Sequence, residues 1–436
     1  MSGLGQATEH TYDIVGVGFG PSNIALAIAI DEHNRTAPSS RQITAVFLEQ
    51  QDTFGWHRGM LIDDATMQIS FLKDLVTFRN PTSDFSFVSY LHQQRRLADF
   101  TNHQILFPTR VEFHSYLEWC ATRLADRVDY GQRVARIRPS PGEFDASTLE
   151  VVAESAAAGV TTSWRARNVV LATGLRPFLP EVAVRSDRVW HSEELMHRVT
   201  RFASDVVASF LVVGAGQSAA ETLEYLHRRF PNAQVGSVFA KYGFTPADDT
   251  PFVNGIFDPD TVNTFFNSPP EVKDMLVAYH RNTNYSVVDA ELINELYRRR
   301  YQEKVRHAER LHFLNMSRVT HVCPTADHVA VTVEHLPTRT VRELTVDALV
   351  YATGYRPVDP AEFLGPLAEA CKRDAENRLE VDLNYRVLTS GGLTCGIYLQ
   401  GPTEYSHGLS ATLLSNTAVR AGRILAAIAQ DESDDR

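Results

Sequence analysis

Residues 12–30 read YDIVGVGFGPSNIALAIAI, in which a short apolar strand runs straight into glycines and then into a helix-like segment. A buried strand, a glycine turn and a helix form the entry to a βαβ unit that binds a dinucleotide. Gly16 permits the tight turn, Gly18 lets the backbone approach a pyrophosphate, and Gly20 precedes the helix. Pro21 takes the third fingerprint position, where its missing N–H has no partner in a helix.

The next strand ends in an acidic residue. Residues 43–48 read ITAVFL, and Glu49 follows directly. A carboxylate at that strand end can bind the two hydroxyls of an adenosine ribose. The interval from the glycines exceeds the usual spacing of about 20 residues, and the polar loop at residues 31–42 accounts for the excess. A glycine turn that binds nothing is the alternative, which the strand, the helix and the acidic strand end together disfavour.

A second unit of the same kind begins at residue 210, where the sequence reads FLVVGAGQSAAE. Its next predicted strand, residues 234–240, ends in Lys241 rather than in an acid. A cation attracts the 2′-phosphate of NADPH, whereas a solvated surface lysine would leave that role to other polar residues nearby. The two cradles therefore predict FAD in the first unit and NADPH in the second. The second cradle comprises Gly214, Gly216, Gln217 and Ser218.

Two Ala-Thr-Gly segments, residues 172–174 and 352–354, each follow a strongly apolar strand. That shape occurs where the chain passes between the domains of flavoproteins with two dinucleotides. We predict an α/β fold with two Rossmann-like dinucleotide-binding domains, for FAD and NADPH, and a smaller, partly helical substrate-binding region. The predicted divisions are residues 1–195 for the first part of the FAD-binding domain, 196–345 for the NADPH-binding domain with a substrate-binding insert at about 241–310, and 346–436 for the second part of the FAD-binding domain.

The composition excludes several classes of protein. The 436-residue chain has a formal net charge of −11, which argues against a nucleic-acid partner because a phosphate backbone needs clustered Lys and Arg. Its four cysteines show no C-x-x-C pattern, so we expect neither a metal site nor a disulfide framework. The N-terminus does not read as a signal peptide, and no apolar stretch reaches membrane-spanning length. We expect a soluble cytoplasmic protein that binds no membrane.

Two dinucleotides in one chain imply that electrons pass from NADPH through FAD to an acceptor. A disulfide reductase needs a redox cysteine pair close in sequence, which this chain lacks. A ferredoxin-type reductase should show a basic docking surface, and it has no need of the aromatic insert at residues 51–115. Oxygen remains as the acceptor.

Five blocks of the sequence are long enough to be specific: MQISFLKDLVTFRNPTSDFSFVSYL (67–91), TPADDTPFVNGIFDP (245–259), HRNTNYSVVD (280–289), DALVYATGYRPVDP (347–360) and GPTEYSHGLSATLLSN (401–416). These blocks resemble the ornithine/lysine N-hydroxylating monooxygenases of hydroxamate siderophore biosynthesis. The proline of the first glycine turn is also similar to this family. The resemblance extends from about residue 12 to about residue 425, and two of the blocks look closer to the ornithine enzymes.

The resemblance implies that the flavin performs the chemistry. NADPH would reduce FAD, O2 would add to give a C4a-hydroperoxyflavin, and the substrate amine would attack its distal oxygen while NADP+ stays bound. The protein then binds, orients and excludes side reactions, so no catalytic nucleophile is expected. The amine attacks only when neutral, although its solution pKa is near 10.4 by analogy with lysine. We therefore expect a partly desolvated amine end without carboxylates, and a charged anchor for the amino-acid head.

The resemblance also implies which residues form the substrate site. Lys73 would pair with the substrate carboxylate, and Asn254 and Asn284 would hydrogen-bond the head group. Ser410 would lie beside flavin and substrate. A surface ion pair of Lys73 with its Asp74 neighbour is the alternative, as is turn or cap formation by the two asparagines.

On the same pattern, Met67 and Gln68 line the flavin ring, and Gln68 supports the pocket and could hydrogen-bond the ring. Tyr285 matches a position that contacts NADP(H), as do the Gln and Ser that open the second helix. His57 could face the flavin or only contact a core aromatic ring. The other residues expected at the cofactors are Trp56, Thr353, Gly354 and Leu409.

The expected substrate is L-ornithine, which would yield N5-hydroxy-L-ornithine for a siderophore or peptide product. L-Lysine N6-hydroxylation and hydroxylation of putrescine or cadaverine are the alternatives. A diamine has no carboxylate for Lys73, so this residue separates amino acids from diamines. A different class is an NADPH sensor or uncoupled oxidase that binds FAD and hydroxylates nothing. Family members are commonly tetrameric, so the resemblance also implies a homotetramer.

Overall fold

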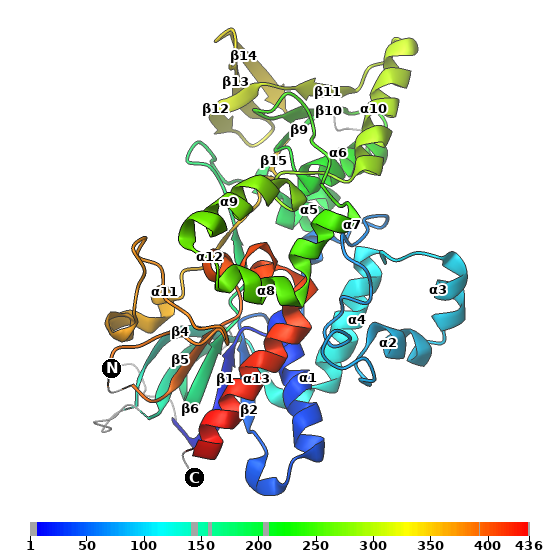
Figure 1. Ribbon diagram of the computed structural model, residues 1–436. Coiled ribbons are helices and arrows are strands. Elements are labelled where there is room, and N and C mark those ends of the chain that lie inside the picture. The colour runs from blue at the N-terminus through cyan, green and yellow to red at the C-terminus, as the bar shows by residue number, and fades with distance from the viewer. Residues whose placement is uncertain (1–6, 141–146, 156–158, 204–208, 392, 435–436) are drawn as a thin grey trace.

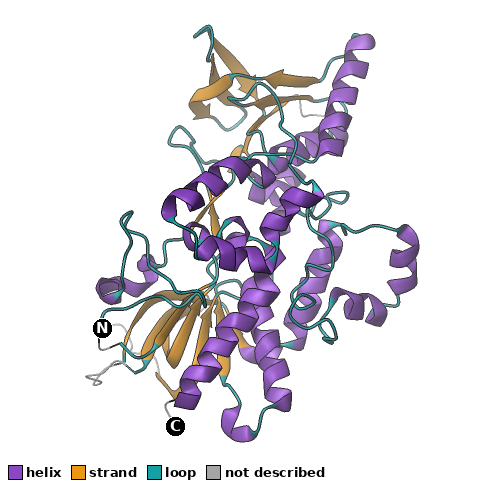
Figure 2. Cartoon of the chain, viewed as in Figure 1, coloured by secondary structure: helices purple, strands orange, loops and turns teal. Residues whose placement is uncertain are grey.

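Two sheets built on parallel strands form the frame of the protein. A computed structural model describes residues 7–140, 147–155, 159–203, 209–391 and 393–434. Figures 1 and 2 show the two sheets at opposite ends of the molecule, with helices and crossing segments between them. This arrangement confirms the predicted α/β fold with two Rossmann-like units.

The lower sheet in Figure 1 has the order β3-β2-β1-β6-β5-β4, with β17 also paired to β6. The β5 strand is antiparallel to both of its neighbours, and the other pairings are parallel. The strands are β1 (Ala7–Val17), β2 (Ala45–Glu49), β3 (Val128–Tyr130), β4 (Gln132–Pro139), β5 (Leu149–Ser155), β6 (Thr161–Leu171) and β17 (Gly396–Leu399).

The central strand β1 is covered on both faces. Ile14 packs into a core that it shares with helices α1 (Pro21–Thr36), α4 (Arg110–Arg123) and α13 (Thr417–Asp434). Val15 points the other way, into a core formed with β5 and β6. Both side chains are fully buried, because alternate residues of a strand face opposite sides of the sheet. This is why the strand reads as a continuous apolar run.

The upper sheet is entirely parallel and has the order β11-β10-β9-β15-β8. An antiparallel three-stranded sheet lies beside it at the top of Figure 1. The parallel strands are β8 (Val189–His191), β9 (Ser209–Val213), β10 (Gln234–Val238), β11 (Leu311–Leu314) and β15 (Ala348–Tyr351). The antiparallel ones are β12 (Ser317–Pro324), β13 (Val329–His335) and β14 (Val341–Val346).

Two strands of the upper sheet lie outside residues 196–345, the range predicted for the NADPH-binding domain. The β8 strand precedes that range, and β15 follows it. The chain also crosses between the sheets through β7 (Leu175–Pro177) and β16 (Tyr355–Pro357), which pair antiparallel. Each of these crossing strands directly follows an Ala-Thr-Gly segment, so the two segments do stand where the chain passes from one sheet to the other.

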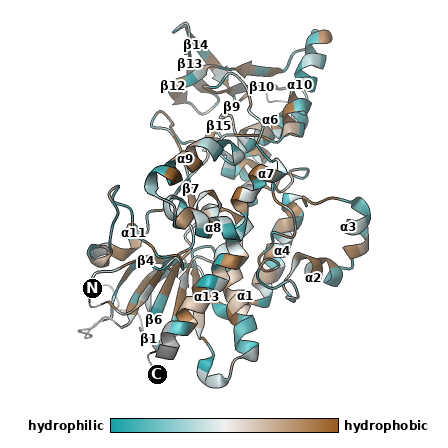
Figure 3. Ribbon diagram, viewed as in Figure 1, coloured by the Kyte–Doolittle hydropathy of each residue, from teal (hydrophilic) through white to brown (hydrophobic). Residues whose placement is uncertain are grey.

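Helices from the two predicted inserts cover the space beside and between the sheets (Figure 1). The aromatic insert contains α2 (Phe87–Gln93) and α3 (Leu97–His103), and its rings pack in contact, as Phe87 does with Phe100 at a centroid distance of 5.6 Å. The second insert contains α7 (Pro251–Asn254), α8 (Pro259–Phe266), α9 (Pro270–His280) and α10 (Ala290–Val305). In Figure 3 the strands of the lower sheet carry both hydrophobic and hydrophilic residues, and so does α10.

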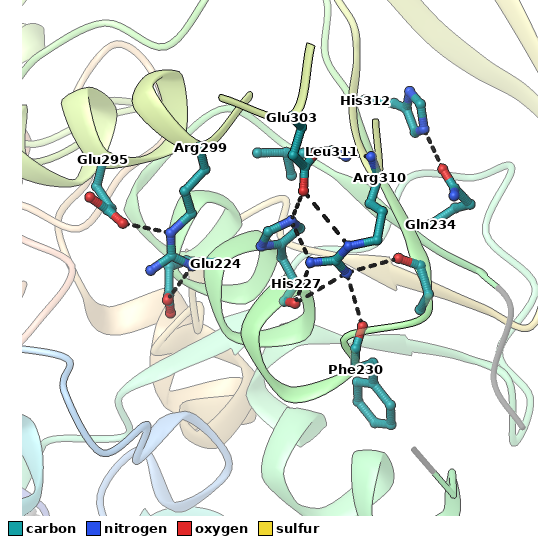
Figure 4. A network of polar contacts seen from close by, with 11 residues as sticks. Glu224, His227, Phe230, Gln234, Glu295, Arg299, Glu303, Arg310, Leu311 and His312 are labelled. Carbon is teal, nitrogen blue, oxygen red and sulfur yellow. Dashed lines mark hydrogen bonds and ion pairs between the residues drawn. The ribbon is translucent and has the colours of Figure 1, made fainter. Parts of the chain in front are cut away.

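A buried polar network fixes α10 to the upper sheet (Figure 4). The Glu303 carboxylate contacts His227 Nε2 at 2.6 Å and accepts the backbone N–H of Arg310 at 2.9 Å. The Arg310 guanidinium donates to the carbonyl of Phe230, just past the end of α6 (Gln217–Arg229). These bonds satisfy the free carbonyls of a helix end, which would otherwise be buried without partners.

The remaining helices are short. Those of α type are α5 (Leu195–Arg198), α11 (Ala361–Leu364) and α12 (Glu404–His407). Those of 3-10 type are η1 (Ser39–Arg41), η2 (Arg58–Met60), η3 (Ala125–Arg127), η4 (Ser192–Glu194), η5 (Val199–Arg201), η6 (Gly255–Phe257), η7 (Arg281–Thr283), η8 (Gly365–Ala370), η9 (Leu409–Thr412) and η10 (Leu414–Asn416). In the described part of the chain, none of the helices has the length and apolar character required to cross a bilayer.

Each glycine turn packs against the carbonyl of an Ala-Thr-Gly segment. Gly18 has φ +85°, and a Cβ there would lie 2.5 Å from the carbonyl oxygen of Ala172. Gly214 has φ +147°, and a Cβ there would lie 2.3 Å from the corresponding oxygen of Ala352. Only glycine satisfies both the backbone angle and the close approach.

We predict that Gly18→Ala destabilises the protein. The left-handed backbone costs about 1–2 kcal/mol for a residue with a Cβ, and the contact with the Ala172 carbonyl adds to that cost. Urea unfolding should therefore show a free energy of unfolding lower by at least about 2 kcal/mol. The matched control is Gly243→Ala, because a Cβ at Gly243 meets no atom within 4 Å. Equal stability of the two variants would contradict the prediction.

Candidate active site between two dinucleotide cradles

The first cradle opens directly in front of α1. Gly20 is the N-cap of this helix and Pro21 its first residue. A Cβ built at Gly20 meets no atom within 4 Å, so the helix N-terminus faces open space. The amide of Asn23 donates to the carbonyl of Gly18 at 2.7 Å and holds the turn in place. Backbone N–H groups and the helix dipole favour an anion here, so these residues fit a pyrophosphate.

Glu49 closes the other side of this cradle, at the end of β2 as predicted. Its carboxylate accepts the backbone N–H of Phe19 at 2.8 Å and that of Gln51 at 2.9 Å. The residue is only 7 % exposed. These bonds orient the carboxylate and leave it further lone pairs, because an ionised carboxylate can accept about four hydrogen bonds. The group therefore fits the hydroxyls of a ribose.

The aromatic insert supplies the residues expected at the flavin ring. Met67 is buried, and its backbone N–H donates to the Pro108 carbonyl at 2.8 Å. The neighbouring Gln68 is exposed. Trp56 is half-buried and packs edge-on against His57, with ring centroids 4.6 Å apart. Because Met67 is buried and Gln68 beside it is exposed, the Gln68 amide is accessible to a ligand.

His57 contacts aromatic rings from both sides of the molecule. Its backbone is left-handed with φ 50°, and its ring lies 6.0 Å from that of Tyr355, just after the second Ala-Thr-Gly segment. Loss of water lowers the pKa of His57 to about 4, and the nearby charges of Arg110 and His114 act in the same direction. Thr353 and Gly354 lie in that segment, where Gly354 has φ +78°.

The second cradle opens in front of α6, with Gly216 as the N-cap. Gln217 is the first helical residue, and its side chain has partners on both sides. Its Nε2 donates to Glu221 at 3.0 Å, and its Oε1 accepts the backbone N–H of Asp289 at 2.8 Å. Gln217 thus connects the cradle to the start of α10. Ser218 is half-buried in the same first turn.

The sequence predicted Lys241 at the end of a strand, and that prediction is wrong. The β10 strand ends at Val238, three residues earlier. The backbone carbonyl of Lys241 accepts the N–H of Met316 at 2.9 Å. Its Nζ donates to the carbonyl of Ser286 at 2.6 Å. Partial burial lowers the pKa of this ammonium. The residue remains on the same side as Gly216, because a Cβ at Gly216 would lie 3.5 Å from Ser286.

Among the described residues, no acidic side chain forms an ion pair with Lys73. Lys73 is half-buried, and its Nζ lies 5.8 Å from the ring centroid of Phe257. Loss of water lowers the pKa of this ammonium, and Asp258 opposes the shift. Asp74 does not pair with Lys73, because it is buried and accepts the backbone N–H groups of Val76 at 2.9 Å and of Phe87 at 2.7 Å.

The other expected substrate residues come from segments that lie far apart in the sequence. Asn254 ends α7, donates to the Asp249 carbonyl at 2.8 Å, and directly precedes η6, which carries Phe257. The η6 helix contacts η9, which carries Leu409 and Ser410. Ser410 is 1 % exposed, so its hydroxyl lies below the surface.

Asn284 lies in a segment that joins the two halves of the molecule. It follows η7, and its backbone N–H donates to the Arg281 carbonyl at 3.3 Å. The hydroxyl of the adjacent Tyr285 donates to the Glu404 carboxylate in α12, which directly precedes η9. Asn284 is thus the sequence neighbour of Tyr285, and Tyr285 contacts α12, the helix directly before the Ser410 segment.

Several residues of this region carried no signal in the sequence. Arg110 and Glu221 form a buried bidentate pair at 3.0 and 2.8 Å, which joins α4 of the lower half to α6 of the upper half. Asn416 donates to the Ser410 hydroxyl at 2.8 Å. Arg420 in α13 is 2 % exposed and donates to the Ser22 hydroxyl at the first cradle. Lone charged and amide residues in helices are too common for sequence patterns to single these out.

The described residues contain no cluster of three His, Cys, Asp or Glu side chains arranged to hold a metal ion. They do contain two helix N-termini that open directly after glycine turns, one beside each of the two large sheets. That combination defines a flavoprotein fold with two dinucleotide sites.

The chain belongs to the L-lysine 6-monooxygenase/L-ornithine 5-monooxygenase family, whose model matches residues 10–357. It is similar to a solved ornithine N-hydroxylase from Kutzneria sp. 744, with 46% identity, coverage of 97% of this chain and 100% of that one, and a TM-score of 0.92. An L-ornithine N(5)-oxygenase of Arthrobotrys oligospora is 38% identical over 96% of this chain and 88% of its own length. The solved L-lysine 6-monooxygenase of Pseudomonas syringae is 30% identical over 96% of this chain and 99% of that one, with a TM-score of 0.83.

Proposed function

We propose that this enzyme hydroxylates the side-chain amine of L-ornithine at N5. FAD is the bound cofactor, and NADPH and O2 are consumed in the reaction. The observation that carries the proposal is the half-buried Lys73 ammonium, which has no acidic partner in the described residues and lies beside the segment of Asn254. Burying an unpaired cation is costly, so such a group calls for an anionic ligand. The carboxylate of an amino acid supplies one. The greater identity to enzymes named for ornithine than to one named for lysine supports the choice of substrate.

The first cradle holds FAD in this proposal. The turn would hold the pyrophosphate, Glu49 the ribose, and the aromatic insert the flavin ring. When reduced and bound, FAD activates O2 for transfer of one oxygen atom to the amine. The residues proposed to contact FAD are Gly16, Gly18, Gly20, Pro21, Glu49, Trp56, His57, Met67, Gln68, Thr353, Gly354 and Leu409.

The second cradle holds NADPH. Its turn would hold the pyrophosphate at the start of α6, and Lys241 would supply positive charge for the 2′-phosphate. The Lys241 ammonium is held by the Ser286 carbonyl, which carries no net charge, so the cation stays available to a phosphate. The residues proposed to contact NADPH are Gly214, Gly216, Gln217, Ser218, Lys241 and Tyr285.

The residues around the substrate separate its charged head from its reacting end. Lys73 would bind the carboxylate, while Asn254 and Asn284 would hydrogen-bond the head group. Ser410, buried in η9, would lie at the flavin end. An environment poor in water disfavours the charged form of an amine and so lowers its pKa. The protein thereby favours the neutral amine, which alone has a lone pair to accept oxygen.

A panel of amines tests the proposed function. The purified enzyme with FAD and NADPH should convert L-ornithine to a hydroxylated product in near-stoichiometric ratio to NADPH consumed. L-Lysine and putrescine should give far less product, because the first is one methylene longer and the second has no carboxylate for Lys73. NADPH and product are measured together, with peroxide as the by-product. NADPH consumption that yields only peroxide with every amine would identify an uncoupled oxidase instead.

Replacing Lys73 tests the carboxylate anchor. Lys73→Met keeps an apolar stem and removes the charge, so we expect the ornithine KM to rise by about 100-fold, since a charged hydrogen bond is worth about 1.5–3 kcal/mol. Flavin reduction by NADPH should change less than about threefold, because that step needs no ornithine. Lys304→Met on the exposed face of α10 is the control. An unchanged KM would remove Lys73 from the substrate site.

A homotetramer in the cytoplasm completes the proposal. Cys120 and Cys371 are buried and form no disulfide, which suits a reducing compartment. Exposed aromatic side chains on one face of α10, Tyr297 and Tyr301, offer surface to another copy. Light scattering on the purified protein should give the mass of four chains, and a monomeric mass would overturn this part.

A further inference from the structure

Residues 281–289, which we call the strap, run between the two halves of the molecule. On the side of the upper sheet, the Val288 N–H donates to the Thr245 carbonyl at 2.9 Å, and the Ser286 carbonyl accepts from Lys241. The strap ends at Asp289, whose N–H is held by Gln217 in the second cradle. Several backbone and side-chain bonds therefore fix this edge of the strap to the NADPH side.

On the opposite side, the Tyr285 side chain of the strap contacts the lower half. The Tyr285 hydroxyl donates to the Glu404 carboxylate at the first residue of α12. Glu404 is half-buried, and within the described residues it forms no ion pair. Loss of water raises the pKa of Glu404, whereas the Tyr285 hydrogen bond and the Arg281 charge lower it. A partly desolvated carboxylate without an ion pair is costly, so its retention needs a reason.

The geometry of the strap links this bond to the substrate site. The Arg281 carbonyl accepts the N–H groups of both Asn284 and Tyr285, at 3.3 and 2.8 Å, and the Arg281 guanidinium lies 5.5 Å from the Tyr285 ring centroid. Fixing the Tyr285 side chain thus fixes the backbone at Asn284. On the other side, Gly408 follows α12 with φ +83°, and η9 with Ser410 begins at the next residue.

We propose that Glu404 is a positioning residue for the substrate, because it accepts the Tyr285 hydrogen bond and so holds Asn284 in register with Ser410. This inference rests on the proposed function and refines it. Glu404 does not act on the reacting amine, and its charge is not required. Its essential property is an acceptor oxygen at the place that the Tyr285 hydroxyl reaches.

A double-mutant cycle with a conservative rescue tests the inference. Glu404→Ala should raise the ornithine KM about tenfold at saturating NADPH, with kcat within about twofold, because a lost hydrogen bond of about 1.4 kcal/mol is a factor of ten. Tyr285→Phe should raise the ornithine KM by at least as much, because it removes the same bond. The double variant should show no larger KM than Tyr285→Phe alone, since Glu404→Ala removes only a bond that the Tyr285 change has already removed. Glu404→Gln keeps an acceptor oxygen, so its KM should stay within about threefold of the unchanged enzyme.

Two comparisons make the result specific. Glu376→Ala, at an exposed glutamate in the same part of the chain, should leave the ornithine KM unchanged. The FAD content and Tm of each variant show whether it is folded, and Tyr285→Phe and Glu404→Gln remain informative if Glu404→Ala is not. A KM increase of about 100-fold in the double variant, or a Gln variant as impaired as the Ala variant, overturns the inference. If the unchanged enzyme gives no hydroxylated ornithine, the proposed function fails instead.

Discussion

The close approach of each glycine turn to the carbonyl of an Ala-Thr-Gly segment is the constraint on which the rest of the structure depends. At Gly18 and at Gly214 there is no room for a Cβ beside that carbonyl, and the backbone lies at positive φ. Each contact packs the end of the neighbouring strand, β6 or β15, against the glycine turn of the proposed cofactor site. The chain then leaves through β7 and β16, which pair with each other, so the two cradles and the crossing between the sheets form one unit.

Side-chain contacts between the halves differ in the energy they contribute. The Arg110–Glu221 pair is bidentate and nearly buried, and loss of one partner from such a pair costs about 3–5 kcal/mol because the other charge is left without compensation. Exposed pairs such as Arg298–Glu295 contribute roughly 0–1 kcal/mol. The relative placement of the halves therefore depends on the buried pair and on the strap far more than on the many surface ion pairs.

The proposed substrate site lies where these constraints meet. Lys73 comes from the aromatic insert of the lower half, Asn254 and Asn284 from the helical insert of the upper half, and Ser410 from the segment that returns to the lower sheet. Binding therefore requires both halves in one relative position, which the contacts between them maintain. Such preorganisation reduces the entropy lost when substrate binds.

The sequence by itself determined the local features of this protein. Strands followed by glycines indicated both glycine turns, the acid after residues 43–48 is Glu49 at the end of β2, and the insert expected to be partly helical contains α10, capped by Asp289. These signals are local, because hydrophobic period, turn chemistry and capping act over a few residues. Only the tertiary structure decided that β8 and β15 join the upper sheet, that Lys241 lies beyond β10, and that Tyr285 meets Glu404, a residue 119 positions away. Such contacts depend on how whole elements pack, and no pattern within one segment encodes them.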